Sequence, residues 1–471
     1  MAEPAASAGA SERIAADLVI EGAAILTMDA KRRVILDGAL AIAGDHIVAV
    51  GKREALAQSV VAKRRLNARR FVITPGFVDG HIHITGDPLT RGLRRGAPGE
   101  APSSVMSRWV IPIFRAHTAQ EEALSAQVAA LAMMRAGTTC FLEAGTVSHL
   151  DAVMEALEGT GIRGRLGEWV EGRAYDPSAD AKAVCAAAIA VLEREVERWP
   201  ADGRRLAAWP ILVGHSTNPD EVWRAAKALA DANGLGVSAH MSPRSADPEW
   251  FLATYGERPL AHLARIGVLG DNVCLTHLAC IDEGELEHLA ASGAHAIFCP
   301  HAAIQGAFGV SRQGLYPEMV AGGVNVLLGT DGVATNLPSS ARLMAGIFRD
   351  ARFDAELFPP TSLLELITVN GARALRLAGD IGSLEAGKKA DFVLHDTDVP
   401  EWGPVVEPVS QLALSAPARA VHSVWIDGVQ VIDDGRATLF DEEALLARAR
   451  VAGAEVIART GLPPQSPWPV L

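Results

Sequence analysis

Two histidines separated by one residue are the first sign of chemistry in this chain. His81 and His83 flank Ile82 at the end of an apolar run, and residues i and i+2 of an extended strand project to the same side. Both imidazoles can therefore bind one metal ion. The pair alone is weak evidence, because the chain has 14 histidines and a histidine at a strand end is often structural.

Three further metal-binding residue types end later apolar runs. His240 closes "GVSAH", His277 closes "NVCLTH", and Asp331 lies in "VNVLLGTDG". Imidazole and carboxylate groups together suit Zn, Fe, Co or Mn. Five such groups near the ends of four runs predict a metal site where the runs end.

The middle of the chain supplies the elements that must position these groups. Short apolar runs alternate with amphipathic helical stretches, which is typical of repeated βα units and a parallel sheet. We expect eight strands, at 71–83, 138–145, 162–172, 206–215, 236–242, 272–279, 294–302 and 324–332. Eight units predict a (β/α)₈ barrel, whose chemistry lies at the carboxyl ends of its strands.

The two ends of the chain have a different pattern. Residues 16–70 and 379–440 contain short alternating runs with Asp-Gly turns at 427–428 and 434–435, which predict hairpins. We expect an α/β fold in which a barrel of residues 71–378 carries a small β-sandwich built from both chain ends. Residues 1–15 are predicted to be a flexible tail, and residues 441–471 a C-terminal helix and tail.

Composition narrows the class of protein. The chain has 471 residues and a formal net charge of -13, which argues against a nucleic-acid partner. No secretory signal or membrane span is predicted. Five widely spaced cysteines without a CxxC pair indicate reduced thiols. We expect a cytoplasmic enzyme with a small-molecule substrate, assembled as a homodimer or higher homo-oligomer.

The chain resembles the amidohydrolase superfamily. The matching segments are "TPGFVDGHIH" (74–83), "SAH" (238–240), "LTH" (275–277) and "GTDG" (329–332). The resemblance implies a metal-activated water, with His81, His83, His240 and Asp331 as ligands and with His277 and Asp331 as catalytic residues. Members with two metals have a Lys or Glu at the end of the fourth strand, and "LAAWPILVGH" has neither, which implies one divalent ion, expected to be Zn, with Fe, Co and Mn as alternatives.

One position departs from the ring-deaminating members of this superfamily. Those members commonly carry a Glu three residues after the fifth-strand His, whereas this chain has Pro243, which cannot transfer a proton. The segment "HMSP" is similar to the branch with phenylurea and thiocarbamate hydrolases. We therefore expect hydrolysis of an amide, urea or carbamate. The alternative is deamination or dehalogenation of an N-heterocycle, which requires another carboxylate such as Glu143 near the ring nitrogen. A barrel that has lost its chemistry is a third hypothesis.

Four residues are predicted substrate contacts. They are Trp109, Glu143, His215 and His301, which follow strands or lie in the long connection 84–118. For each, a structural role is the alternative: Trp109 can pack the connection onto the barrel, and the two histidines can be hydrogen-bonded supports.

Overall fold

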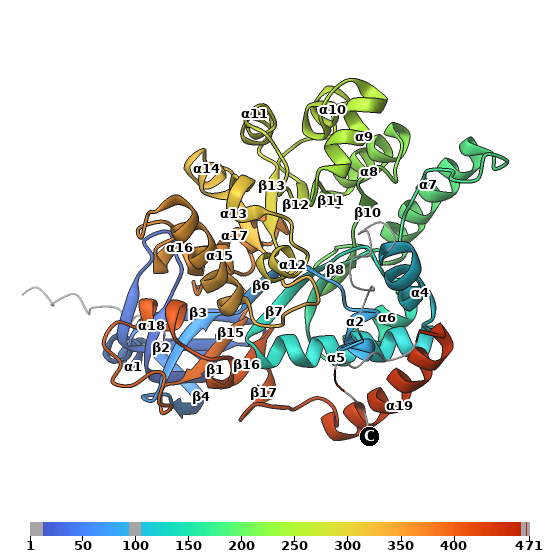
Figure 1. The fold of residues 1–471 in the computed structure, drawn as a ribbon. Coiled ribbons are helices and arrows are strands. Elements are labelled where there is room, and N and C mark those ends of the chain that lie inside the picture. Colours follow the sequence, from blue (N-terminus) through green and yellow to red (C-terminus); the bar gives the residue numbers. More distant parts are fainter. Residues whose placement is uncertain (1–12, 94–104, 463–467, 469–471) are drawn as a thin grey trace, which may run out of the picture.

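The computed structural model describes residues 13–93, 105–462 and 468. Its centre is a ring of parallel strands, which confirms the predicted α/β barrel (Figure 1). The strands are β6 (Phe77–Ile82), β7 (Thr138–Glu143), β8 (Arg163–Leu166), β9 (Leu206–Ala208), β10 (Ile211–Gly214), β11 (Val237–Met241), β12 (Val273–His277), β13 (His295–Phe298) and β14 (Val326–Leu328).

The barrel has nine strands at eight positions because β9 and β10 are two parts of an interrupted fourth strand. β9 pairs with β8, β10 pairs with β11, and only Trp209 and Pro210 separate β9 from β10. Proline has no backbone N–H and cannot donate to a sheet ladder. The expected strand 206–215 is therefore two short pieces, and the barrel consists of a four-stranded sheet, β6 to β9, and a five-stranded sheet, β10 to β14.

Helices connect and surround the barrel strands (Figure 1). Thr118 and Glu121 form a capping box at the start of α5, and Asp282 and Glu285 form another at α11. The helices between the strands are α2 (Asp87–Thr90), η1 (Met106–Val110), α4 (Ile111–Arg115), α5 (Ala119–Arg135), α6 (Leu150–Glu158), α7 (Ala181–Arg198), α8 (Asp220–Asn233), α9 (Ala246–Tyr255), α10 (Pro259–Arg265), α11 (Glu283–Ser292), α12 (Pro300–Gln305), α13 (Val310–Gln313) and α14 (Tyr316–Ala321), and after β14 come α15 (Leu337–Arg352), α16 (Pro360–Leu366) and α17 (Val369–Ala374).

Strands from both chain ends join in one nine-stranded sheet, seen in Figure 1 as blue and orange-red strands side by side. Phe392 stacks on Trp425 in its core, with ring centroids 4.8 Å apart. The members are β1 (Ile14–Leu26), β2 (Val34–Ala43), β3 (His46–Lys52), β4 (Val60–Asn67), β5 (Phe71–Pro75), β15 (Phe392–Asp396), β16 (Val421–Ile426), β17 (Val429–Asp433) and β18 (Arg436–Ala437), with α1 (Arg53–Ser59), α18 (Pro408–Leu414) and η2 (Ala418–Ala420) beside them.

The expected single strand 71–83 is divided at Gly76. β5 pairs with β1 and β15 in the outer sheet, whereas β6 pairs with β7 in the barrel. A Cβ at Gly76 would lie 2.0 Å from Oγ1 of Thr139, so only glycine allows the chain to pass so close to β7. The change from outer sheet to barrel therefore occurs at residue 76 rather than at residue 70.

A strand begins near the N-terminus, and a helix lies near the C-terminus. Of the expected tail 1–15, residues 1–12 lie outside the described residues, and β1 already begins at Ile14. The C-terminal helix is α19 (Glu442–Thr460), held to α5 by hydrogen-bonded ion pairs between Arg459 and Glu121 at 2.8 Å and between Glu442 and Arg135 at 2.8 Å. Within the described ranges, no helix has both the length and the apolar character to span a membrane.

Candidate metal centre

Five predicted residues meet at the carboxyl ends of the barrel strands. The ligand atoms of His81, His83 and Asp331 lie within 4.8 Å of one another, and so do those of His81, His240 and His277. His81 belongs to both sets, so they form a single centre. Asp331 Oδ1 lies 2.9 Å from His83 Nε2 and 3.5 Å from His81 Nε2.

Hydrogen bonds fix which nitrogen of two histidines faces the centre. His240 Nδ1 donates to the carbonyl oxygen of Val213 at 2.8 Å. His83 Nδ1 lies 3.1 Å from Thr146 Oγ1, and that hydroxyl donates to a carboxylate oxygen of Glu143 at 2.7 Å, so it accepts from His83. Both Nε2 atoms therefore present lone pairs, which is the arrangement that outer partners impose on metal-binding histidines.

His81 provides the test of whether the site fits a metal ion. Its side chain is 1% exposed, and Thr276 Oγ1 lies 3.1 Å from its Nδ1. Its Nε2 is buried and has no hydrogen-bond partner within the described part of the chain. A buried nitrogen without a partner is costly in a protein, and a bound cation removes that cost. The donor set, three imidazoles and a carboxylate around this atom, fits one divalent ion.

The protonation of the cluster also suits a cation. Burial lowers the pKa of His81, takes that of His240 well below its usual value and lowers that of His277 to about 3. Burial alone would raise the pKa of Asp331, but the nearby rings of His81 and His83 outweigh it and hold this pKa well below the usual range. Neutral imidazoles and an ionised carboxylate are the states that bind metals.

The backbone at the centre is unusual as well. His277 and Asp331 have φ angles of 84° and 56°, and His215 has 52°. Such left-handed conformations are unfavourable for side chains other than glycine, and they concentrate at functional sites. They aim the strand-end side chains into the barrel mouth.

The four predicted substrate contacts occupy different environments. His215 is 28% exposed on its side chain, its ring stacks 5.5 Å from His240, and its Nδ1 lies 2.6 Å from Asp247 Oδ2. Glu143 is fully buried behind His83 and accepts from the backbone of the turn that follows β7. Trp109 is buried in η1, and Nδ1 of His301 lies 3.2 Å from Ser340 Oγ.

Several residues of the site were not predicted from the sequence. Asp79 accepts hydrogen bonds from the backbone of His81 and from Thr330, and its place two residues before His81 on the same strand was the available signal. Sγ of Cys299, at the end of β13, lies within 4.8 Å of donor atoms of His277 and Asp331. The rings of Phe114 and Phe308 contact His83 and His277 from distant segments, and no local pattern indicates them.

Comparison with known proteins agrees with this geometry. The model of the amidohydrolase family matches residues 72–431. The chain is 31% identical over 449 residues to a 5-methylthioadenosine/S-adenosylhomocysteine deaminase of Syntrophobacter fumaroxidans, covering 94% of this chain and 98% of that protein. A deaminase of the same name from Nitratidesulfovibrio vulgaris (strain Miyazaki F) is 29% identical, covering 94% and 99%.

Solved structures give the same fold. An adenosine deaminase from Xanthomonas campestris, with bound zinc, superposes with a TM-score of 0.84 at 26% identity and covers 95% of this chain and 100% of its own. Atrazine chlorohydrolase from Arthrobacter aurescens, complexed with zinc, has a TM-score of 0.80 at 20% identity and covers 93% and 100%. With a family model that spans most of its length and a metal-binding centre at the barrel mouth, this chain belongs to the amidohydrolase family and is a metal-dependent hydrolase acting on carbon–nitrogen bonds.

Proposed function

We propose that the protein is a hydrolytic deaminase of an amino-substituted N-heterocycle. The observation that carries this proposal is the near full-length similarity to 5-methylthioadenosine/S-adenosylhomocysteine deaminases, supported by the likeness to an adenosine deaminase. The preference expected from the sequence, an amide, urea or carbamate hydrolase, thereby becomes the second candidate. The predicted alternative becomes the first.

The proposed ligands of the single ion are His81, His83, His240 and Asp331. Zinc is the proposed ion because it is bound in both solved structures compared above, and Fe, Co or Mn would satisfy the same donor set. When bound, the ion supplies a Lewis acid and lowers the pKa of a water molecule towards about 7.

Asp331 and His277 handle protons in the proposed reaction. The carboxylate of Asp331 accepts a proton from the attacking water as the carbon–oxygen bond forms, and it returns a proton to the amine as the carbon–nitrogen bond breaks. Neutral His277 lies beside the same centre and orients the water through its ring nitrogen. The products are ammonia and the ring carbonyl compound.

His215 is the proposed substitute for the acid that is absent at Pro243. Its Nδ1 is held 2.6 Å from Asp247, and Asp247 is fixed in turn by the backbone N–H of Ser242 at 2.7 Å. The ring is partly exposed and stacks on His240, so its Nε2 can donate a hydrogen bond to a ring nitrogen of a substrate. Proton transfer from His215 would replace the missing carboxylic acid.

The other predicted contacts receive separate roles. We assign Glu143 to positioning, because its bond to Thr146 acts on His83 and none of its surface is exposed. Trp109 and His301 remain proposed walls of the substrate site. A cytoplasmic location and a homo-oligomeric state remain predictions, and light scattering during size-exclusion chromatography tests the second.

Amide, urea or carbamate hydrolysis is the second candidate because of Pro243. A substrate with its own acyl carbonyl needs no ring-nitrogen acid, and Pro243 cannot act as one. The two candidates release different products, which makes them distinguishable.

The test is a product assay with zinc-replete protein. Aminopurine nucleosides, chlorotriazines, phenylureas and carbamates are incubated separately, and ammonia, halide, amine and carbon dioxide are measured. We expect ammonia from an aminopurine substrate, and His215→Asn should reduce its release more than His288→Asn, an exposed control on α11. Amine and carbon dioxide without ammonia would establish the second candidate, and inactivity on the whole panel would support a non-catalytic barrel.

A further inference from the structure

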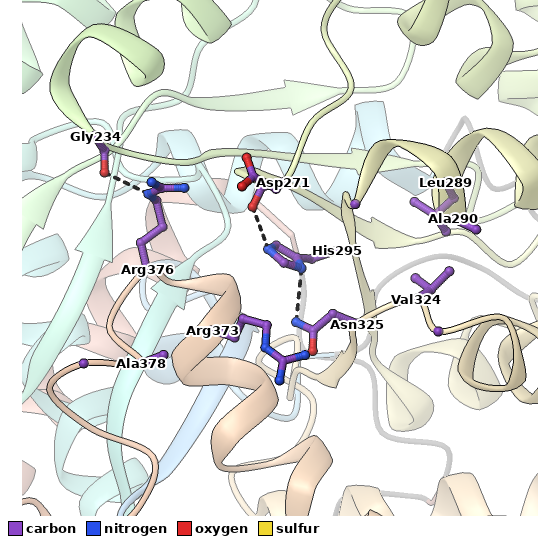
Figure 2. Close-up of a pocket in the computed structure, with 13 residues that line it drawn as sticks. Gly234, Asp271, Leu289, Ala290, His295, Val324, Asn325, Arg373, Arg376 and Ala378 are labelled. Carbon is purple, nitrogen blue, oxygen red and sulfur yellow. Dashed lines mark hydrogen bonds between the residues drawn. The ribbon is translucent and has the colours of Figure 1, made fainter. Parts of the chain in front are cut away.

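Two adjoining cavities lie at the end of the barrel opposite the metal centre. One has a volume of about 620 Å³ and is called here the His295 cavity after the residue that begins β13 (Figure 2). The second has a volume of about 390 Å³ and is called the Arg165 cavity after a residue of β8. Gly234 and Arg376 line both cavities, so the two share a wall.

The Arg165 cavity is basic in an acidic protein. Its lining includes four arginines and one lysine against a single carboxylate residue, Asp380, although the whole chain has a formal net charge of -13. The cationic lining residues are Arg163, Arg165, Arg204, Arg376 and Lys389. Such a concentration of one charge sign in a concave site attracts anions.

Most of these cations have carboxylate partners. Arg163 is paired with Asp391 at 3.1 Å and with Asp427, Lys389 pairs with Asp45 at 2.5 Å, and Arg204 pairs with Asp202 at 3.0 Å. These pairs are the ordinary way in which a protein compensates buried or half-buried charge.

Within the described residues, Arg165 and Arg376 form no such pair, and of the two only Arg165 is buried. Arg165 is 4% exposed, and its Nη1 donates to the carbonyl oxygens of Gly164 at 3.0 Å and Arg205 at 3.1 Å. No carboxylate within the described residues forms an ion pair with it. Burial lowers the pKa of Arg165 to about 10, so it stays charged at neutral pH. A buried cation without an anion is unfavourable, and a bound anion would compensate it.

The His295 cavity has a mixed lining, in which uncharged polar and apolar groups lie beside Asp271, Arg373 and Arg376. Both ring nitrogens of His295 are occupied, by the carbonyl oxygen of Asp271 at 3.0 Å and by the amide nitrogen of Asn325 at 3.1 Å, as the dashed lines of Figure 2 show. Asn325 Oδ1 is buried and has no partner in the described part of the chain. Leu289 and Val324 add apolar walls.

We propose that these cavities bind a phosphorylated small molecule, with its phosphate in the Arg165 cavity and its uncharged body in the His295 cavity. Guanidinium groups such as those of Arg165 and Arg376 bind phosphate oxygens through paired, charge-assisted hydrogen bonds. Arg376, whose Nε donates to Gly234 at 3.0 Å, lies where the two cavities meet. An N–H or O–H group of the body satisfies Asn325 Oδ1. This site is independent of the chemistry proposed at the metal centre.

The test uses the full chain and simple probes in titration calorimetry. Uridine monophosphate carries both a phosphate and an N–H donor, uridine lacks the phosphate, and inorganic phosphate lacks the body. We expect binding in the order uridine monophosphate, then phosphate, with no binding of uridine. Arg376→Ala and Arg165→Met should each weaken uridine monophosphate binding about tenfold or more, because each removes charge-assisted hydrogen bonds.

The control is Arg448→Ala, which removes an exposed arginine from α19 and should leave binding unchanged. If Arg165→Met does not fold, the exposed Arg376→Ala variant decides the outcome alone. Equal binding by all four proteins, equal binding of uridine, or no binding of either phosphate compound at millimolar concentration would overturn the proposal.

Discussion

The two ends of the barrel contain buried polar groups of opposite binding character. At the carboxyl end, neutral histidines and Asp331 surround a buried nitrogen of His81 that has no hydrogen-bond partner among the described residues, an arrangement suited to a cation. At the amino end, the charged guanidinium of Arg165 forms no ion pair with a carboxylate in the part of the chain that the structure describes, an arrangement suited to an anion. A barrel packed throughout its interior can therefore present opposite binding chemistry at its two mouths.

Two buried groups near the ends of β8, Glu195 and Arg165, differ in how the cost of a buried charge can be avoided. Glu195 of α7 is 3% exposed, its Oε2 accepts from the backbone of Glu168 just after β8, and burial raises its pKa to about 8. It can escape the cost of a buried charge by taking up a proton. Arg165 cannot lose its proton at neutral pH, so only an anion can compensate it.

The largest expected effect is at the carboxyl end. His81→Gln removes the nitrogen that both donor sets share, so bound metal should fall from about one ion per chain to near zero, and activity should fall on the order of a thousandfold. Elemental analysis and turnover measure the two effects. His288→Gln on the exposed face of α11 should change neither. Full metal content in His81→Gln would show that His81 does not bind the ion, and the carboxyl end could then not be contrasted with the amino end as a cation site.

Next is a pair of substitutions at the amino end. Arg163→Met leaves Asp391 and Asp427 without their cation and should lower the free energy of unfolding by about 3–5 kcal/mol. Arg165→Met, on the same strand, removes an uncompensated cation and should change the free energy of unfolding by less than about 1 kcal/mol. Urea denaturation compares the two. Equal losses would mean that Arg165 is a structural residue like Arg163.

A smaller effect is expected behind the metal centre. Thr146→Val breaks the chain from Glu143 to His83 while it keeps the size of the side chain, and it should weaken metal affinity about 10- to 100-fold. Competition with a chelator measures this affinity. Thr217→Val, which removes a hydroxyl that donates to the carbonyl oxygen of Gly214 at the end of β10, is the matched control. Unchanged affinity in Thr146→Val would show that Glu143 does not act through His83.

The smallest expected effect is a change with pH in the free energy of unfolding, caused by Glu195. The folded protein keeps a proton up to pH about 8 that an unfolded glutamate releases near 4.5, so wild-type stability should decline as pH rises between these values. The slope relative to Glu195→Gln should be at most about 1.4 kcal/mol per pH unit. Denaturation at pH 5, 6, 7 and 8 measures it, with exposed Glu193→Gln as control. Parallel profiles for wild type and Glu195→Gln would contradict the protonated state.

Part of the candidate site could be predicted because it depends on local periodicity. His81 and His83 share a face of β6 by their spacing alone, and His240, His277 and Asp331 follow apolar runs whose ends must meet in a barrel. The comparisons nonetheless favoured deaminase relatives, although Pro243 had pointed to an acyl substrate. One residue cannot decide a substrate when a side chain from another strand can take its role.

The sequence by itself determined the barrel, the presence of a β-unit built from both chain ends and the cluster of metal-binding residues. The structure shows that this unit, predicted as a sandwich, is one nine-stranded sheet. Only the tertiary structure decided the division of the first strand at Gly76, the partner of Asp247 and the contrast between Arg163 and Arg165. Side-chain spacing along a strand follows from backbone geometry and is local. Whether a buried charge finds a partner depends on residues hundreds of positions away, such as Asp391 for Arg163, and no local pattern contains that information.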